Sequence, residues 1–382
     1  MAMPVRKFSI PEILFGRGSM QYVGTCAARL GAEKVFFVSD PGLEKAGWVD
    51  KVFDLLETEK LKWVYYSNVV ANPRDHQVEE GAQLYLDEGC DVVVSLGGGS
   101  PMDAAKGIAL VASNGGKVHH YEGANRIHRP LPPMVFIPST AGSGSDVSQF
   151  AIINDVQRRV KMSIISRTLV PNISIIDPNI LTTKTKSLII AAAIDAIAHA
   201  AESYVSKISS PFTEVHSLKS IDIIIKSLPI ALETMGIDAL EQLSVASTSA
   251  GMAFSNASLG MDHALAHSLG GMLDVVHGLI HPVLLPHVLR FNMPACPTKV
   301  ADIGEIVMGK RYSSDEKTAL AGIEKLEEFS HELNVSTRLR DIITDHAGLP
   351  QVCQMAANDS CLLTNPRPAT WEEMLQLCEE AW

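Results

Sequence analysis

The chain has 382 residues, of which 46% are hydrophobic and 20% charged, and its formal net charge is −11. This length suggests two or three domains with ample core, and the composition is that of a globular protein rather than a disordered one. An acidic chain without a basic arm or clustered Lys and Arg lacks what a phosphate backbone requires, so the composition excludes nucleic-acid binding.

The sequence gives no sign of export or membrane insertion. Residues 1–10 carry two basic residues with no apolar run behind them, so no signal peptide is expected. The most apolar stretch, 188–201, is interrupted by Asp195 and His199 and is too short to span a bilayer. The six cysteines form no CxxC pair, and a core of this size needs no disulfides. We therefore expect a cytoplasmic protein with reduced thiols.

The first half of the chain alternates short β-branched runs with helical stretches such as 79–88. We predict five buried strands, at 34–40, 63–68, 91–96, 134–138 and 173–177. Continuous apolar strands that alternate with helices indicate a parallel sheet covered on both faces. The first domain, residues 1–181, should therefore be α/β.

The character of the chain changes at about residue 182, after a turn that contains Pro178 and several threonines (IDPNILTTKTK). Strand-like runs vanish, and long helical segments rich in Ala, Leu and Ile follow at 187–205, 213–228 and 241–254. We expect a second, all-helical domain over residues 182–382, and we find no repeat or low-complexity tract.

A glycine-rich turn, GGGSPMD over 97–103, joins a predicted strand to the helix expected at 104–112. Three glycines let the backbone approach a ligand, and the helix N-terminus offers N–H groups to an anion. We expect Ser100 at the N-cap and Asp103 at the reciprocal capping position. The spacing is not GxGxxG, so no standard Rossmann fingerprint is supported. The sequence favours a phosphate cradle made by Gly97, Gly98, Gly99, Ser100 and Asp103, although a purely structural turn is the alternative.

Two further polar features follow predicted strands. Asp40 ends the strand at 34–40, where a carboxylate can bind a ribose diol and repel a 2′-phosphate, which favours NAD over NADP. The alternative is ordinary turn chemistry before Pro41. The loop STAGSGSD over 139–146 should reach the same edge of the sheet, so its hydroxyls could line a pyrophosphate or nicotinamide pocket, unless it is a flexible linker. The candidate residues in this loop are Ser139, Thr140, Ser143 and Ser145.

Seven of the 13 histidines fall between His199 and His287. Asp195 and His199 are four residues apart in a helical run of Ala and Ile, so both lie on one apolar face, where an unpaired carboxylate would be costly. That pair alone could be a buried hydrogen bond.

A second group, in MDHALAHSLGGMLDVVHG, supplies His263, His267 and His277. A straight helix would separate His263 from His277 by roughly 21 Å, so we expect the Gly270-Gly271 pair to break it. Asp195, His199, His263 and His277 would then form a set of three nitrogens and one carboxylate that suits Fe(II) or Zn(II). The alternative is a group of hydrogen-bonded core histidines.

Taken together, these motifs closely resemble the iron-containing (group III) alcohol dehydrogenases. The resemblance runs nearly end to end and includes FGRGSM at 15–20, ANP at 71–73 and NPRPAT at 365–370. It implies the four metal ligands given above, with His267 beside the nicotinamide, and it implies at least a homodimer. It also implies dinucleotide contacts from Asp40, Asn72, Gly98, Gly99, Ser100, Thr140, Ser143, Lys161 and Leu181.

Two residues depart from the family pattern. Asp262 stands where an apolar or small residue is usual, and His281 stands where Asn or a small residue is usual. Each is open to interpretation as a spare ligand, a partner of a ligand or a surface residue.

We therefore predict an NAD-dependent, metal-dependent alcohol dehydrogenase that interconverts a small primary alcohol or diol and its aldehyde. The metal would lower the pKa of the alcohol, hydride would pass to the nicotinamide, and His267 would relay the proton. One alternative is a lyase that resembles dehydroquinate synthase, but such an enzyme needs Lys and Arg around the metal, and residues 252–285 contain none. The other alternative is a non-catalytic relative that only binds nucleotide or metal.

Overall fold

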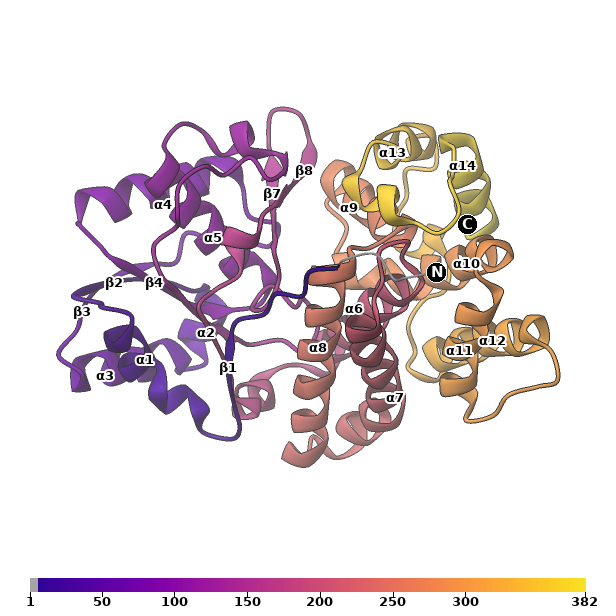
Figure 1. Cartoon of the computed structure of the whole chain (residues 1–382), viewed down its shortest axis with the longest axis horizontal. Helices are drawn as coiled ribbons and strands as arrows, with labels where there is room; N and C mark the ends of the chain where they lie inside the picture. The colour runs from indigo at the N-terminus through magenta and orange to yellow at the C-terminus, as the bar shows by residue number, and fades with distance from the viewer. Residues whose placement is uncertain (1–5) are drawn as a thin grey trace. The chain divides into compact units, whose positions relative to one another are not determined.

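The computed structural model describes residues 6–382, which form two compact units. The first unit is Ser9–Thr185, and the second is Lys186–Trp382 together with the described residues up to Phe8. Figure 1 shows the strands in the indigo-to-magenta part of the chain and mostly helices in the later, red-to-yellow part. The division falls close to the boundary that we expect at residues 181 and 182.

The first unit is built on a six-stranded parallel sheet. Its strands lie in the order β1-β9-β6-β4-β2-β3, and each neighbouring pair is parallel. Val35 of β2, for example, lies opposite Trp63 of β3 and Val92 of β4. The strands are β1 (Glu12–Phe15), β2 (Lys34–Val38), β3 (Lys62–Tyr66), β4 (Val92–Gly97), β6 (Met134–Pro138) and β9 (Ile173–Ile176). The predicted α/β class is confirmed.

Helices cover both faces of this sheet because successive strand residues point to opposite sides. Phe36 belongs to an apolar cluster with residues of α4 and α5, whereas the adjacent Phe37 belongs to a second cluster with residues of α1 and α3. Both rings are fully buried. The helices of this unit are α1 (Val23–Arg29), α2 (Pro41–Lys45), α3 (Trp48–Thr58), α4 (Asp75–Asp87) and α5 (Gly99–Asn114).

A second, three-stranded sheet was not predicted from the sequence. The hairpin of β7 (Phe150–Asp155) and β8 (Val160–Ile165) is antiparallel, and β5 (Gly123–Ala124) pairs in parallel with β8. The apolar runs FAIIND and VKMSII on either side of a polar turn are the signal that could have revealed this hairpin. The hairpin places Lys161 opposite Asn154.

The second unit is helical throughout its described regular elements. Its helices are α6 (Lys186–Val205), α7 (Pro211–Thr234), α8 (Ile237–Ala257), α9 (Met261–Leu273), α10 (His281–Asn292), α11 (Pro297–Met308), α12 (Asp315–Glu332), α13 (Leu349–Ala356) and α14 (Trp371–Glu380). Within the described chain only α6 is long and apolar enough to cross a bilayer, but 83% of its most apolar stretch is buried inside the protein. This is the pattern of a core helix.

Candidate functional site

The carboxyl edge of the parallel sheet collects most of the residues that the sequence suggests for dinucleotide binding. The chain runs from β2 to the edge strand β3 and then returns to β4 on the other side of β2, so the strand order reverses between β2 and β4. In open α/β sheets, ligands bind in the crevice outside the strand ends at such a reversal. Asp40 follows β2, and the glycine turn follows β4.

The glycine turn begins its helix earlier than predicted. Helix α5 begins at Gly99 with Gly98 as its N-cap, so the prediction of Ser100 at the N-cap is wrong. Gly98 makes no side-chain capping bond, because glycine has no side chain to offer. The Ser100 hydroxyl instead accepts a hydrogen bond from the backbone amide of Asn72, at 3.2 Å. This contact places two predicted dinucleotide residues, one in the loop after β3 and one in the first turn of α5, next to each other.

The hydroxyl-rich loop after β6 lies against the glycine turn. A Cβ added at Gly98 would meet Thr140 Cγ2 at 3.3 Å, and one added at Gly99 would meet Ser143 Cβ at 3.2 Å and Ser145 Oγ at 3.5 Å. The absence of side chains at these two glycines therefore lets the loops pack closely. The loop therefore packs against the glycine turn rather than standing apart from it as a linker.

Three other residues predicted to contact the dinucleotide lie in protein surroundings that the structure describes. Asp103 is buried and accepts a hydrogen bond from the amide of Ile152 at 3.2 Å; burial raises its pKa to about 6 in spite of nearby Lys106. Lys161 lies on β8, and its charge acts on Asp103. Leu181 is buried in the 3₁₀ turn η4 (Pro178–Thr183). Dinucleotide contacts from these residues remain predictions.

Asp40 has a local role that matches the turn-chemistry alternative. It is the N-cap of α2, and its Oδ1 accepts hydrogen bonds from the amides of Gly42 at 2.9 Å and Leu43 at 3.1 Å. This capping fixes the carboxylate at the end of β2. Its contact with a ribose stays a prediction.

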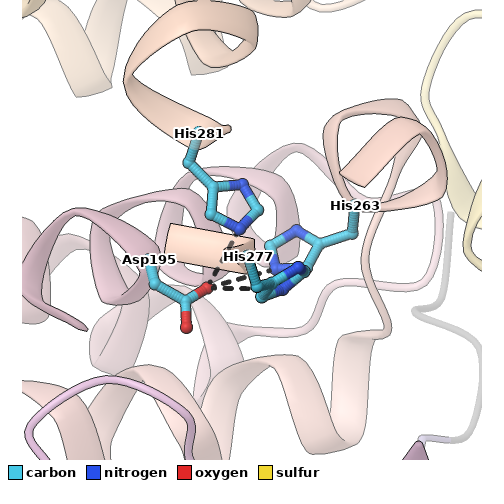
Figure 2. A group of neighbouring side chains, drawn as sticks. All are labelled: Asp195, His263, His277 and His281. Atoms are coloured by element: carbon cyan, nitrogen blue, oxygen red, sulfur yellow. Dashed lines mark ion pairs between the residues drawn. The ribbon is translucent and has the colours of Figure 1, made fainter. Parts of the chain in front are cut away.

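In the helical unit, one carboxylate and several imidazoles converge. The donor atoms of Asp195, His263, His277 and His281 all lie within 4.8 Å of one another. Figure 2 shows the three rings directed toward the Asp195 carboxylate. Burial would raise the pKa of Asp195, but the surrounding imidazoles, including His199, hold it well below its usual range.

The chain reverses between His263 and His277, but not at the predicted place. Helix α9 continues through Gly270 and Gly271 to Leu273 and ends at Asp274, which adopts a left-handed conformation with φ 53°. The predicted break at the glycine pair is therefore wrong, because a helix tolerates internal glycine and Asp readily takes a left-handed φ.

The 3₁₀ turn η5 (His277–Leu279) then returns His277 to the ring of His263, with 5.5 Å between the ring centroids. A Cβ at Gly278 would lie 2.7 Å from the carbonyl oxygen of Ala191 on α6. The close approach of η5 to the helix of Asp195 therefore requires glycine at this position.

His199 lies at the margin of the group. Its Nε2 is 3.5 Å from Asp195 Oδ1, and its ring stacks between Phe254 and His263, with centroid separations of 4.3 and 4.5 Å. It is not one of the four residues whose donor atoms are mutually close. His199 therefore stays a predicted ligand, and His281 occupies a place in the group that the sequence left open.

Buried carboxylates stand behind two of the rings, and the sequence analysis missed one of them. Glu202 accepts a hydrogen bond from His263 Nδ1 at 2.7 Å, and Asp262 accepts one from His281 Nδ1 at 2.6 Å. Both carboxylate side chains are at most 1% exposed. Glu202 lies seven residues after Asp195 on α6, and this helical spacing was a signal that could have identified it.

His267 has a separate partner. Its Nδ1 lies 2.9 Å from Asp359 Oδ2, and Asp359 comes from the segment that precedes the 3₁₀ turn η8 (Ser360–Thr364). Burial would raise the pKa of Asp359, but the charge and hydrogen bond of His267, together with the amide of Cys361, hold it below its usual range. No spacing in the sequence connects Asp359 with His267, since 92 residues separate them.

The donors of the group fit a divalent metal ion. Asp195 Oδ1, His263 Nε2 and His281 Nε2 are buried and have no hydrogen-bond partner within residues 6–382. A buried polar atom left in this way costs about 1–3 kcal/mol, whereas a cation would satisfy all three atoms together. Imidazole nitrogen and carboxylate oxygen are ligands of both iron and zinc.

Comparison with known proteins finds relatives that match nearly the whole chain. Residues 11–178 match the family profile "Iron-containing alcohol dehydrogenase", and residues 189–382 match "Fe-containing alcohol dehydrogenase family, C-terminal". The 1,3-propanediol dehydrogenase of Klebsiella pneumoniae is 35% identical over 383 residues, which are 98% of each chain. The NAD-dependent methanol dehydrogenase of Bacillus methanolicus is 34% identical over 377 residues, 98% of this chain and 99% of its own.

The same result comes from solved structures. The crystal structure of a 1,3-propanediol oxidoreductase, 35% identical, matches with a TM-score of 0.96 over 99% of this chain and 100% of that one. Because the family profiles cover both units and the relatives span nearly the full length, this chain is a metal-dependent alcohol dehydrogenase that belongs to the iron-containing alcohol dehydrogenase family.

Proposed function

We propose that this enzyme interconverts a small primary alcohol or diol and its aldehyde, with NAD as the hydride carrier and Fe(II) as the metal, although Zn(II) could bind the same donors. The proposed ligands are Asp195, His199, His263 and His277. The observation that carries the proposal is the buried convergence of Asp195 Oδ1 with the Nε2 atoms of His263 and His281, none of which has a hydrogen-bond partner within residues 6–382.

The proposed dinucleotide site is the carboxyl edge of the sheet. Its pyrophosphate would meet the amides at the N-terminus of α5, where Gly98 adds no side chain. The proposed contacts are Asp40, Asn72, Gly97, Gly98, Gly99, Ser100, Asp103, Ser139, Thr140, Ser143, Ser145, Lys161 and Leu181. The packing of the hydroxyl loop on the glycine turn supports this assignment, and the name of the Bacillus methanolicus relative supports NAD.

When bound, the metal supplies Lewis-acid polarisation of the alcohol oxygen, and NAD supplies the hydride acceptor. The protein's own groups fix where protons reside. Glu202 accepts a hydrogen bond from His263 Nδ1, which keeps a proton on that nitrogen and directs Nε2 toward Asp195. Asp359 does the same for His267, so Nε2 of His267 can take the proton that the alcohol releases.

The alcohol class follows from the surroundings of the donors. The neighbours of Asp195 and His199 on α6 are Ala and Ile, and residues 252–285 contain no Lys or Arg. Such surroundings favour a short aliphatic substrate over an anionic one.

The test is an alcohol and aldehyde panel with NAD and NADP on iron-loaded and zinc-loaded enzyme, together with the variant His277→Ala. We expect short primary alcohols to yield NADH, and we expect metal content and turnover to fall together in the variant. His287→Ala, on α10 but outside the group, is the matched control and should keep both. Normal metal content and turnover in His277→Ala would contradict the ligand assignment.

The family membership is also the ground on which we propose a cytosolic location and a homodimer or larger homo-oligomer. Light scattering on the purified enzyme and fractionation of cells would test these two proposals.

A further inference from the structure

We propose that His281 is an additional protein donor to the metal and that Asp262 holds its ring for this purpose. This inference rests on the proposed function, because it adds a donor to the metal centre described there.

The position of His281 is that of a ligand. Its Nε2 lies 3.2 Å from Asp195 Oδ1, closer than the Nε2 atoms of His199 at 3.5 Å, His263 at 3.6 Å and His277 at 3.9 Å. Figure 2 shows the ring entering from the start of α10 and pointing at the same carboxylate oxygen as the rings of His263 and His277. Four imidazole rings thus lie around Asp195 Oδ1.

The surroundings of the ring direct Nε2 toward the Asp195 group. His281 is fully buried, and its Nε2 has no hydrogen-bond partner in the part of the chain that the structure describes. Away from the group, His281 lines a small and mainly apolar cavity with Ile194, Leu285 and Phe329. A cation bound by the Asp195 group would satisfy this buried nitrogen.

Asp262 determines which ring nitrogen faces the group. Its Oδ2 is 2.6 Å from His281 Nδ1 but 3.8 Å from His263 Nδ1, so its hydrogen bond goes to His281. The carboxylate accepts a hydrogen bond from Nδ1–H, so in the neutral ring the Nε2 lone pair faces Asp195. Glu202 treats His263 in the same way at 2.7 Å. Histidines that bind metals almost always donate their other N–H to a carboxylate, carbonyl or water, and two rings here share that arrangement.

The additional donor alters the chemistry of the site. With Asp195 and the three predicted histidine ligands, His281 brings the count of protein donors to five. Zinc sites are almost always four-coordinate when structural and use three protein ligands when catalytic. A five-donor set of nitrogen and oxygen therefore suits iron better than zinc.

The experiment measures binding of Co(II), a spectroscopic substitute for iron, to metal-free enzyme by competition with a chelator. The variants are His281→Asn, Asp262→Asn and the double variant, with His287→Asn as a control on the same helix and His277→Ala as a reference for the loss of a proposed ligand. Loss of a carboxylate behind a metal-bound histidine typically weakens metal binding by about 10–100-fold, so we expect Asp262→Asn to fall in that range. His281→Asn should weaken binding at least as much and alter the visible Co(II) bands.

The double variant separates a metal role from a packing role. If Asp262 acts through His281, the double variant should bind Co(II) no more weakly than His281→Asn alone. Wild-type Co(II) affinity and bands in His281→Asn, beside lost binding in His277→Ala, would overturn this inference and leave the proposed metal centre standing. Absence of Co(II) binding by the wild-type protein would overturn both.

The wild-type enzyme supplies a measurement that depends on no variant. In the Co(II) form, the Nδ1 proton of each metal-bound histidine gives a strongly shifted proton resonance, and the His281 proton, enclosed with Asp262, should exchange slowly with solvent. If His281 is instead an imidazolium held between Asp195 and Asp262, its resonances will not acquire that shift, and the inference fails.

Discussion

Replacement of Glu202 probes how α6 and α9 are held together at the metal centre. Its carboxylate is 1% exposed and accepts hydrogen bonds from four groups: the amides of Gly260 at 3.0 Å, Asp262 at 2.7 Å and His263 at 3.3 Å, and Nδ1 of His263 at 2.7 Å. One side chain thus caps the N-terminus of α9 and orients a proposed ligand. A Cβ at Gly260 would lie 2.7 Å from Glu202 Oε1, so this capping requires glycine there.

The magnitude of the loss follows from these contacts. Glu202→Ala leaves the α9 amides and the His263 ring buried without an acceptor. Removing one member of a buried charged network typically costs about 3–5 kcal/mol, and we expect the free energy of unfolding to fall by that amount. Glu202→Gln keeps one carbonyl acceptor but turns an amide N–H₂ toward the donors, so a loss of about 1–3 kcal/mol is expected. Both variants should also weaken metal binding about 10–100-fold.

The assay is urea unfolding of the metal-free enzyme followed by helical circular dichroism, with hydrogen exchange at the amides of Asp262 and His263. Those two amides should lose protection in Glu202→Ala. Glu233→Ala, at an exposed position of α7, is the control and should change the unfolding free energy by less than about 0.5 kcal/mol. A Glu202→Ala variant that unfolds like the control and keeps protected α9 amides would refute the reasoning.

Three further predictions address the dinucleotide, the proton and the helical core. Asp40→Gly should raise NADP use and lower NAD use because it removes a negative charge at the end of β2. It should change the unfolding free energy by only a few tenths of a kcal/mol, since glycine is an acceptable N-cap. Equal use of both cofactors by the native enzyme would contradict the prediction. His267→Ala should retain the metal while turnover falls about 10²–10⁴-fold, and Asp359→Asn should lower turnover in the same direction; metal loss in His267→Ala would make His267 a ligand instead. Gly322→Ala should lower the unfolding free energy by about 1–3 kcal/mol. The added Cβ would lie 2.1 Å from Gly304 Cα, where α12 crosses α11. Unchanged thermal unfolding would contradict that packing.

The sheet could be predicted because its central strands β2, β4, β6 and β9 are largely buried and therefore appear as continuous apolar runs. The strand ends could not be placed so well. The runs at 34–40 and 173–177 each end in an Asp that leaves the ladder, because its carboxylate binds backbone amides of the following turn: Asp40 caps α2, and Asp177 accepts from Asn179. The short strand β1 (EILF) carries too few residues for a periodic signal.

The convergence of Asp195 with His263 and His277 could be predicted in outline because helical spacing places Asp195 with His199, and His263 with His267, on single faces. What spacing cannot give is where a helix ends. Gly270-Gly271 suggested a break, but packing keeps α9 helical to Leu273, and the reversal occurs over the next few residues. Sequence spacing also says nothing about Asp359, whose approach to His267 depends on how the C-terminal segment folds against α9.

Asp262 and His281 show most clearly that sequence spacing alone does not predict which buried polar residues become partners. Each alone is an unexplained polar residue, and the sequence allows a surface position for both; the structure buries both completely and joins them at 2.6 Å. A buried carboxylate without a partner and a buried imidazole without one would each destabilise the fold. Together they satisfy each other's Oδ2 and Nδ1, and the ring nitrogen of His281 that has no hydrogen-bond partner within residues 6–382 faces Asp195. The pair is therefore tolerated as a unit, and its remaining unsatisfied nitrogen lies where a metal ion would use it.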